Sequence, residues 1–144
     1  IIEFGVSNFT PSQFNLIDQT TSISVNQIEF SLTQYSAMHN GILDQLLQKE
    51  VIPMSWSPLG SYFKETNAAN KRIKKVLDVF TKKYNATEDQ LLLAWILKHP
   101  SGVIPVVGTT SKVRLQNAVK ALDIELDLED WFTLLVECQG HKVP

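Results

Sequence analysis

Short apolar runs alternate along the chain with segments in which apolar residues recur every three or four positions. Four of the runs, at residues 1–6, 25–30, 51–56 and 103–107, are rich in Val, Ile and Phe. Runs of this length and composition are typical of buried strands. Spacing by three and four positions is typical of helices with one buried face. The sequence therefore predicts strands that alternate with helices.

Capping signals mark where two of the helices begin. Thr10 and Gln13 form a capping box, which predicts a helix over residues 10–20. Thr87 and Gln90 form a second capping box. The helix that follows the second box is apolar on nearly all sides, so we expect it to be buried by several neighbouring elements.

The other four helices are predicted from their apolar faces. We expect each face to be buried, and we expect Asp127 to cap the last helix. The faces consist of Leu43, Leu46 and Leu47; of Ile73, Val76, Leu77, Phe80 and Tyr84; of Leu115, Ala118, Val119 and Leu122; and of Leu128, Trp131, Phe132 and Leu135.

Alternation of strands and helices predicts a parallel α/β sheet with helical crossovers. A doubly wound open sheet and a (β/α)8 barrel both fit, and four units do not decide between them. No Gly/Ser-rich linker or internal repeat divides the chain, so we predict one domain over residues 1–144. In both architectures the ligand binds at the carboxyl ends of the strands.

Composition and charge narrow the function classes. Apolar residues make up 44% of the 144-residue chain and charged residues 19%, which is typical of a globular core. The net charge of -2 argues against general nucleic-acid binding. No apolar run reaches the length of a membrane span, and the single cysteine, Cys138, excludes an intrachain disulfide. We therefore expect a soluble, cytoplasmic protein with no membrane or nucleic-acid partner.

Amide, hydroxyl and aromatic side chains lie where the first three strands end. Ser7 and Asn8 follow the first strand, Gln27 lies in the second, and Trp56 ends the third. Asn and Gln each offer a donor and an acceptor, as a carboxamide ligand does, and Trp56 offers a flat face for a ring. Each residue also has a structural alternative: helix capping for Ser7 and Asn8, a backbone bond for Gln27, and the core for Trp56.

The segment after the fourth strand has the composition of an anion site. Hydroxyls and two cations precede or begin a predicted helix, where free backbone N–H groups favour a phosphate. The residues concerned are Thr109, Thr110, Ser111, Lys112 and Arg114. The alternative for Thr110 or Ser111 is an ordinary helix cap.

Five separated blocks of the sequence resemble the aldo-keto reductases, which are NADP-dependent enzymes built on a TIM (β/α)8 barrel. The blocks occur in the order and spacing of that family, at residues 5–9, 26–29, 53–60, 93–95 and 104–110. The ending at residues 140–144 resembles a bacterial branch of the family. The resemblance covers essentially the whole chain and corresponds to the C-terminal half of the barrel, strands five to eight.

The resemblance implies a binding site for NADP. It implies that Ser7, Asn8 and Gln27 hold the nicotinamide carboxamide and that Trp56 stacks on the nicotinamide ring. The residues implied for the rest of the cofactor are Ser57 and Leu59 at the pyrophosphate; Thr109, Thr110, Ser111, Lys112 and Arg114 at the 2′-phosphate; and Asn117 near the adenine. A dianionic 2′-phosphate favours paired cations, so the expected cofactor is NADP and not NAD.

The chain departs from the family where catalysis takes place. The family's catalytic tyrosine, aspartate, lysine and histidine come from earlier strands, and no residue here matches those motifs. We therefore predict no catalytic residue and no metal site, and a small carbonyl substrate only for a full-length protein. The chain's tyrosines and histidines are interpreted as structural or surface residues, although Tyr35, Tyr62 and Phe63 could form part of a substrate wall.

Half a barrel would expose the outer edges of its first and last strands. The chain begins inside an apolar run and without Met, so we expect a preceding segment, a separate first half, or self-association to complete it. The function expected is carbonyl/alcohol interconversion by the complete enzyme, with this half inactive alone. One alternative is a non-catalytic nucleotide-sensing or interaction module derived from such a reductase. Another is a phosphosugar isomerase or aldolase barrel, which would leave the strand-end amides unexplained.

Overall fold

A computed structural model describes residues 1–143, so the end of the predicted bacterial-type motif, Pro144, lies outside the described residues. Four parallel strands form one sheet in the order β1-β2-β3-β4. Their bounds are β1 Phe4–Ser7, β2 Ile23–Glu29, β3 Ile52–Trp56 and β4 Ile104–Pro105. Sequential order is typical of a barrel segment, whereas a doubly wound sheet reverses its order at a switch point.

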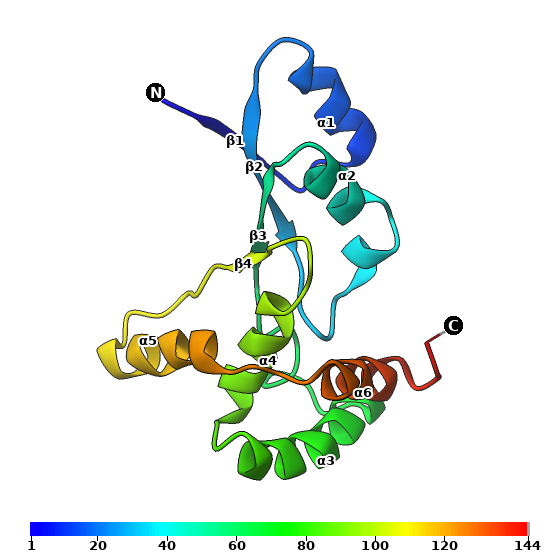
Figure 1. The fold of residues 1–144 in the computed structure, drawn as a ribbon, viewed down its shortest axis with the longest axis vertical. Coiled ribbons are helices and arrows are strands. Elements are labelled where there is room, and N and C mark those ends of the chain that lie inside the picture. Colours follow the sequence, from blue (N-terminus) through cyan, green and yellow to red (C-terminus); the bar gives the residue numbers. More distant parts are fainter. Residues whose placement is uncertain (144) are drawn as a thin grey trace.

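Helices follow each strand, as the alternating pattern predicts (Figure 1). The α-helices are α1 Pro11–Asp18, α2 Ile42–Gln48, α3 Ala68–Lys83, α4 Glu88–Leu97, α5 Lys112–Val119 and α6 Leu128–Gln139. Two short 3₁₀ helices, η1 Ser36–Met38 and η2 Lys120–Asp123, complete the described elements. Helices α1 and α2 lie beside the strands, and α3 to α6 gather at the other end of the molecule.

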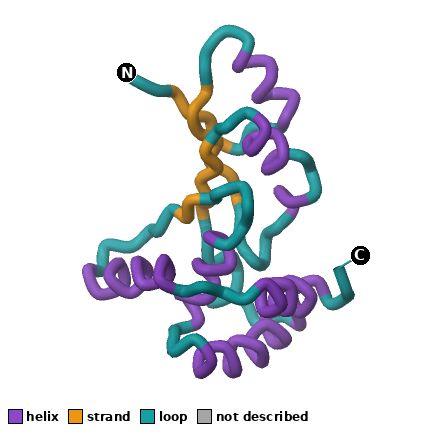
Figure 2. Tube along the Cα trace, in the orientation of Figure 1, coloured by secondary structure: helices purple, strands orange, loops and turns teal. Residues whose placement is uncertain are grey.

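Within residues 1–143, helices cover one face of the sheet and leave the other open. Along β2, Asn26 and Ile28 are buried, whereas the alternate residues Val25, Gln27 and Glu29 are partly exposed. Successive strand residues point to opposite faces, so the second set marks an open face. Figure 2 agrees, because no helix lies on the side of β1 away from α1. In a closed barrel this face would line the interior.

The main core lies between α3, α4, α6 and the covered face of the sheet. At its centre the rings of Trp95 and Trp131 stack with centroids 4.8 Å apart. Each indole also donates to the other residue's backbone: Trp95 Nε1 lies 3.1 Å from Trp131 O, and Trp131 Nε1 lies 2.8 Å from Trp95 O. This reciprocal pair joins α6 to α4 while satisfying both buried indole N–H groups.

Local capping signals account well for two helix starts. Thr10 and Gln13 form the predicted capping box at α1, and Thr87 and Gln90 form the one at α4. The prediction for Asp127 is only half correct, because this residue precedes α6 but its side chain makes no cap hydrogen bond. The Asp127 carboxylate accepts instead from Lys83 Nζ at 2.7 Å.

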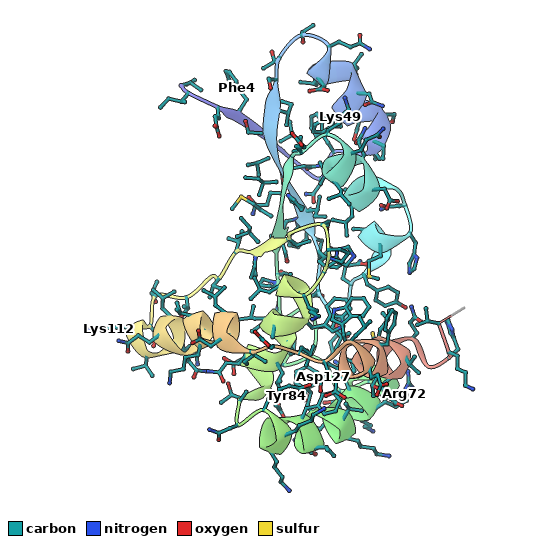
Figure 3. All side chains as sticks on the ribbon, viewed as in Figure 1. Phe4, Lys49, Arg72, Tyr84, Lys112 and Asp127 are labelled. Carbon is teal, nitrogen blue, oxygen red and sulfur yellow. The ribbon has the colours of Figure 1, made fainter. Side chains whose placement is uncertain are left out.

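A tyrosine hydroxyl also binds the start of α6. The Asp127 backbone N–H donates to Tyr84 Oη at 3.0 Å, and the two residues lie close together in Figure 3. Tyr84 Oη in turn donates to Asp130 Oδ2 at 2.5 Å. Burial, followed by this contact with Asp130, raises the pKa of Tyr84. Tyr84 therefore links α3 to α6 and has a structural role.

The outer strands are shorter than the apolar runs predict. Strand β1 starts at Phe4 and not at residue 1, because β2 begins at Ile23, which is the partner of Phe4. Strand β4 contains only Ile104 and Pro105, and proline lacks the N–H needed to continue a ladder. The β3 pairing extends one bond further, from Val106 N to Ser55 O at 2.8 Å.

The predicted burial of the last two apolar faces is partly wrong. Helix α5 has no buried residue; Val119 is 55% exposed, and Leu122 just beyond the helix is 68% exposed. In α6, Trp131 and Leu135 are buried as predicted, whereas Leu128 is 61% exposed. The helical spacing is correct, but the described residues supply no element to cover α5 on this side.

We expect the open edges and the α5 face to make the 144-residue chain self-associate. Replacing Val119 and Leu122 together by Lys should reduce association, because charged side chains oppose burial of this face. Light scattering over a dilution series measures the effect. The matched control is Val79→Lys, since Val79 is 62% exposed on α3. A wild-type chain that stays monomeric at all concentrations would contradict this expectation.

Candidate functional site

The ends of β1, β2 and β3 bring four predicted site residues together. Ser7 lies beside Gln27 in the β1–β2 register, and Trp56 lies beside Glu29 in the β2–β3 register. Ser7 Oγ donates to Gln27 O at 3.1 Å, and Asn8 N donates to the same oxygen at 2.9 Å. Trp56 Nε1 donates to Asn8 Oδ1 at 2.9 Å. The three strand ends are thus joined by hydrogen bonds.

These contacts decide between several interpretations of the strand-end residues. Thr10, and neither Ser7 nor Asn8, caps α1. The side chain of Gln27 makes no hydrogen bond with any described residue, so it is not held by the backbone. Trp56 is only partly buried and lines a cavity. Ser7 and Asn8 are therefore not helix caps, the Gln27 side chain is not bound to the backbone, and Trp56 is not a core residue.

Strands β1 and β3 are each followed directly by a residue with a left-handed backbone conformation. Asn8 has φ of 57° and Ser57 has φ of 49°. Asparagine tolerates this region, whereas serine adopts it at a cost of about 1 to 2 kcal/mol. The turn after Ser57 is also tight, because a Cβ at Gly60 would overlap the hydroxyls of Thr33 and Ser31. Such strained positions occur often at binding sites.

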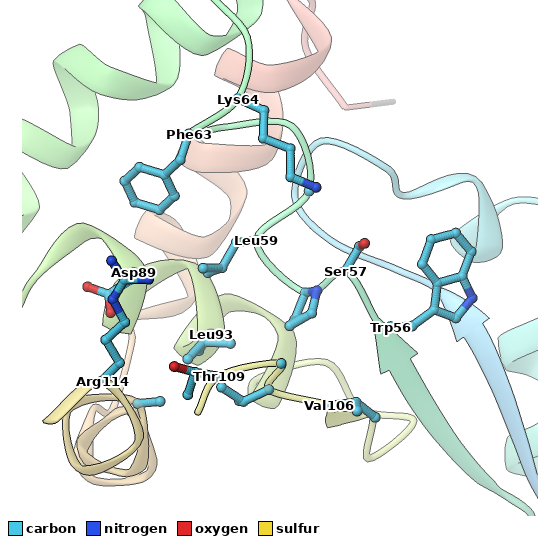
Figure 4. Close-up of a pocket in the computed structure, with 15 residues that line it drawn as sticks. Trp56, Ser57, Leu59, Phe63, Lys64, Asp89, Leu93, Val106, Thr109 and Arg114 are labelled. Atoms are coloured by element: carbon cyan, nitrogen blue, oxygen red, sulfur yellow. The ribbon is translucent and has the colours of Figure 1, made fainter. Parts of the chain in front are cut away.

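A cavity of about 840 Å³ extends from β3 to α5. Figure 4 shows Trp56 at one side of the cavity and Arg114 with Asp89 at the other. Five predicted site residues line it, namely Trp56, Ser57, Leu59, Thr109 and Arg114. A volume of this size suits an extended small-molecule ligand.

The cavity also contains residues that the sequence did not single out for cofactor binding. The principal ones are Phe63 and Lys64 from the loop after β3, and Asp89 and Leu93 from α4. Of the three residues considered for a substrate wall, only Phe63 lines this cavity. Tyr62 is buried against the core, where burial and then the charge of Glu88 raise its pKa. Tyr35 packs at the edge of the same core.

The predicted anion segment divides between the cavity and the surface. Ser111 caps α5, because Arg114 N donates to Ser111 Oγ at 3.4 Å, and Ser111 N donates to Thr109 Oγ1 at 3.2 Å. Thr110, Ser111 and Lys112 do not line the cavity. Lys112 is exposed at the tip of α5, as Figure 3 shows. Arg114 is thus the one cation of this segment that borders the cavity.

Asn117 is engaged with the start of α4. Its Nδ2 donates to Thr87 Oγ1 and to Asp89 Oδ2, both at 3.1 Å. Gln90 Nε2 donates to Asn117 Oδ1 at 2.8 Å and to Asn117 O at 2.9 Å. Asn117 does not line the cavity, so these bonds give it a structural role that the sequence did not reveal.

His99 and Cys138 do not line this cavity. Burial lowers the pKa of His99, whose Nδ1 lies 2.7 Å from Ser101 Oγ. Burial raises the pKa of Cys138 to about 11, and its thiol donates to Leu32 O at 3.0 Å. Across residues 1–143, no three His, Cys, Asp or Glu side chains are grouped so that they could hold a metal ion. None of the helices in this range combines the length and the hydropathy of a membrane span.

Comparison with known protein families gives a match over most of the chain. The family model "Aldo/keto reductase family" matches residues 1–135. A 6-dehydroglucose reductase of Agrobacterium fabrum is 38% identical over 96% of this chain and 47% of its own length. The chain spans about half the length of the curated relatives it matches.

Solved structures show the fold. The thermostable aldo-keto reductase Tm1743 superposes with a TM-score of 0.82 and 23% identity, over 94% of this chain and 48% of that one. An aldo-keto reductase from Klebsiella pneumoniae, solved with NADPH, superposes with a TM-score of 0.76 and 23% identity. The match covers 92% of this chain and 46% of that one. The four-stranded sheet and its helices therefore have the fold of about half of a TIM (β/α)8 barrel.

We expect Asn117→Ala to destabilise the chain by about 1 to 3 kcal/mol, because it removes the partners of several polar groups at the start of α4. Urea unfolding measures the change. Gln116→Ala is the matched control, since Gln116 is exposed on the same helix. An Asn117 variant as stable as the Gln116 variant would contradict the structural role.

Proposed function

Since the chain belongs to the aldo/keto reductase family, we propose that residues 1–144 form a single partial domain that binds NADP. The domain is the cofactor-binding half of an oxidoreductase that interconverts carbonyls and alcohols. The observation that carries this proposal is the convergence of Ser7, Asn8, Gln27 and Trp56 at the carboxyl ends of three strands. A cavity continues from there to Arg114.

The residues present fit a nicotinamide dinucleotide. Amides and a hydroxyl at the strand ends suit a carboxamide, and Gln27 has a side chain free of protein hydrogen bonds among the described residues. Trp56 offers an aromatic face for the nicotinamide ring, with Ser57 and Leu59 beside the pyrophosphate. Bound NADPH supplies a hydride to a carbonyl carbon.

The far end of the cavity favours NADP over NAD. Arg114 borders the cavity and Lys112 lies two residues before it, at the start of α5. With the hydroxyls of Thr109, Thr110 and Ser111, these cations suit a 2′-phosphate. Asn117 lies at the adenine end, where its side chain holds α5 against α4. The Klebsiella reductase, which was solved with NADPH, supports this choice.

Catalysis requires a proton donor beside the carbonyl, and we propose that this chain does not supply one. Among the described residues, no tyrosine or histidine lines the cavity. The chain alone is then inactive, and the complete enzyme needs a first half, attached or separate. Its substrate is a small carbonyl compound, of the sugar type if it follows the Agrobacterium relative. We assign it to the cytoplasm.

The alternative is a nucleotide-sensing or interaction module without catalysis. It is favoured by the same observation, a cavity that no tyrosine or histidine lines among the described residues. The two functions differ when the complete gene product is assayed for carbonyl reduction with NADPH. Turnover supports the enzyme, whereas tight NADPH binding without turnover supports the module.

We expect replacement of Lys112 and Arg114 by Ala to weaken NADPH binding far more than NADH binding, because only NADPH carries the 2′-phosphate. Each lost charge-assisted contact costs about 1.5 to 3 kcal/mol if it is desolvated. Titration of both cofactors, followed by tryptophan quenching, measures the difference. Lys120→Ala, at an exposed position beyond α5, is the control. Equal losses for NADPH and NADH would contradict the 2′-phosphate assignment.

A further inference from the structure

The hydrogen bond between Trp56 and Asn8 fixes which way the Asn8 amide points. Trp56 Nε1 lies 2.9 Å from the Asn8 side chain. An indole nitrogen only donates, so the atom that it meets must be the amide oxygen, Oδ1. The Asn8 Nδ2 group is then left without a protein acceptor among the described residues. Asn8 therefore offers a donor to a ligand before any ligand binds.

The neighbouring Ser7 hydroxyl has the opposite role toward a ligand, because it is an acceptor. Ser7 Oγ donates its one proton to Gln27 O at 3.1 Å. A serine hydroxyl has one proton and two lone pairs, so Ser7 in this arrangement can only accept from a ligand. The same Gln27 oxygen also accepts from Asn8 N at 2.9 Å, which holds the two residues in place. One donor and one acceptor thus stand side by side at the end of β1.

We propose that the Trp56 indole N–H is a positioning group that orients the Asn8 amide, so that the Ser7–Asn8 pair selects a carboxamide and rejects a carboxylate. A primary carboxamide has one acceptor oxygen for Asn8 Nδ2 and one NH2 donor for Ser7 Oγ. A carboxylate has two acceptor oxygens, and one of them would face the lone pairs of Ser7.

This inference rests on the proposed function, because it assigns chemistry to the nicotinamide end of the proposed NADP site. It adds a role for Trp56 that is separate from stacking: the ring face and the N–H group act on different partners. It also adds a ligand preference that the ring face alone does not provide, because nicotinamide and nicotinic acid both carry an aromatic ring.

The first test examines the bond itself, without cofactor. In ¹H–¹⁵N spectra of the 144-residue chain, Asn8→Ala should shift the Trp56 indole N–H resonance and accelerate its exchange with water. The indoles of Trp95 and Trp131 serve as internal controls, because they donate to backbone carbonyls in the core. A Trp56 resonance that does not respond to Asn8→Ala would overturn the proposal.

The second test measures selectivity. Wild-type chain should bind NADP at least about tenfold more tightly than nicotinic acid adenine dinucleotide phosphate, which carries a carboxylate in place of the carboxamide. Trp56→Phe keeps an aromatic face but removes the N–H, so it should reduce this ratio severalfold. Met54→Leu, two residues earlier on the same face of β3, is the matched control and should leave the ratio unchanged.

The outcomes separate this inference from the proposed function. A Trp56→Phe variant that binds NADP with the wild-type ratio overturns the positioning role but leaves NADP binding intact. If the wild-type chain binds neither dinucleotide, the proposed function fails together with the carboxamide selectivity. The ¹H–¹⁵N experiment still decides in that case whether Trp56 positions Asn8, because it needs no ligand.

Discussion

The parallel register of β1, β2 and β3 is the constraint on which the site depends. It pairs Ser7 with Gln27 and Glu29 with Trp56, so the side chains of Asn8 and Trp56, which are 48 positions apart, meet at one edge of the sheet. A shift of one residue in either pairing would turn these side chains to the covered face. The hydrogen bonds of Asn8 with Trp56 and of Ser7 with Gln27 exist only in this register.

The packed core and the proposed binding site lie on opposite faces of the sheet. The core lies on the covered side, where the Trp95–Trp131 pair joins α6 to α4. The other side keeps its polar strand ends exposed, and α5 presents apolar residues with no partner among the described residues. This division explains how a chain that matches half of a barrel keeps both a packed interior and an open cavity.

The parts of the fold that the sequence predicted are those that depend on local chemistry. The capping boxes at Thr10 and Thr87 and the alternation of strands and helices need only neighbouring residues. Features that depend on how two particular helices or loops meet were missed. Nothing near Lys64 in the sequence shows that it borders the cavity, and the bonds of Asn117 depend on how α5 meets α4. The exposure of Val119 likewise depends on what covers α5.

The central claim is that the nicotinamide ring of NADP lies against Trp56 at the carboxyl edge of the sheet. Intermolecular nuclear Overhauser effects between bound NADP and the tryptophan indoles test it most directly. The account predicts cross-peaks from the nicotinamide ring protons to the Trp56 indole and none to Trp95 or Trp131, which are buried. Saturating NADP without cross-peaks to Trp56 would contradict it.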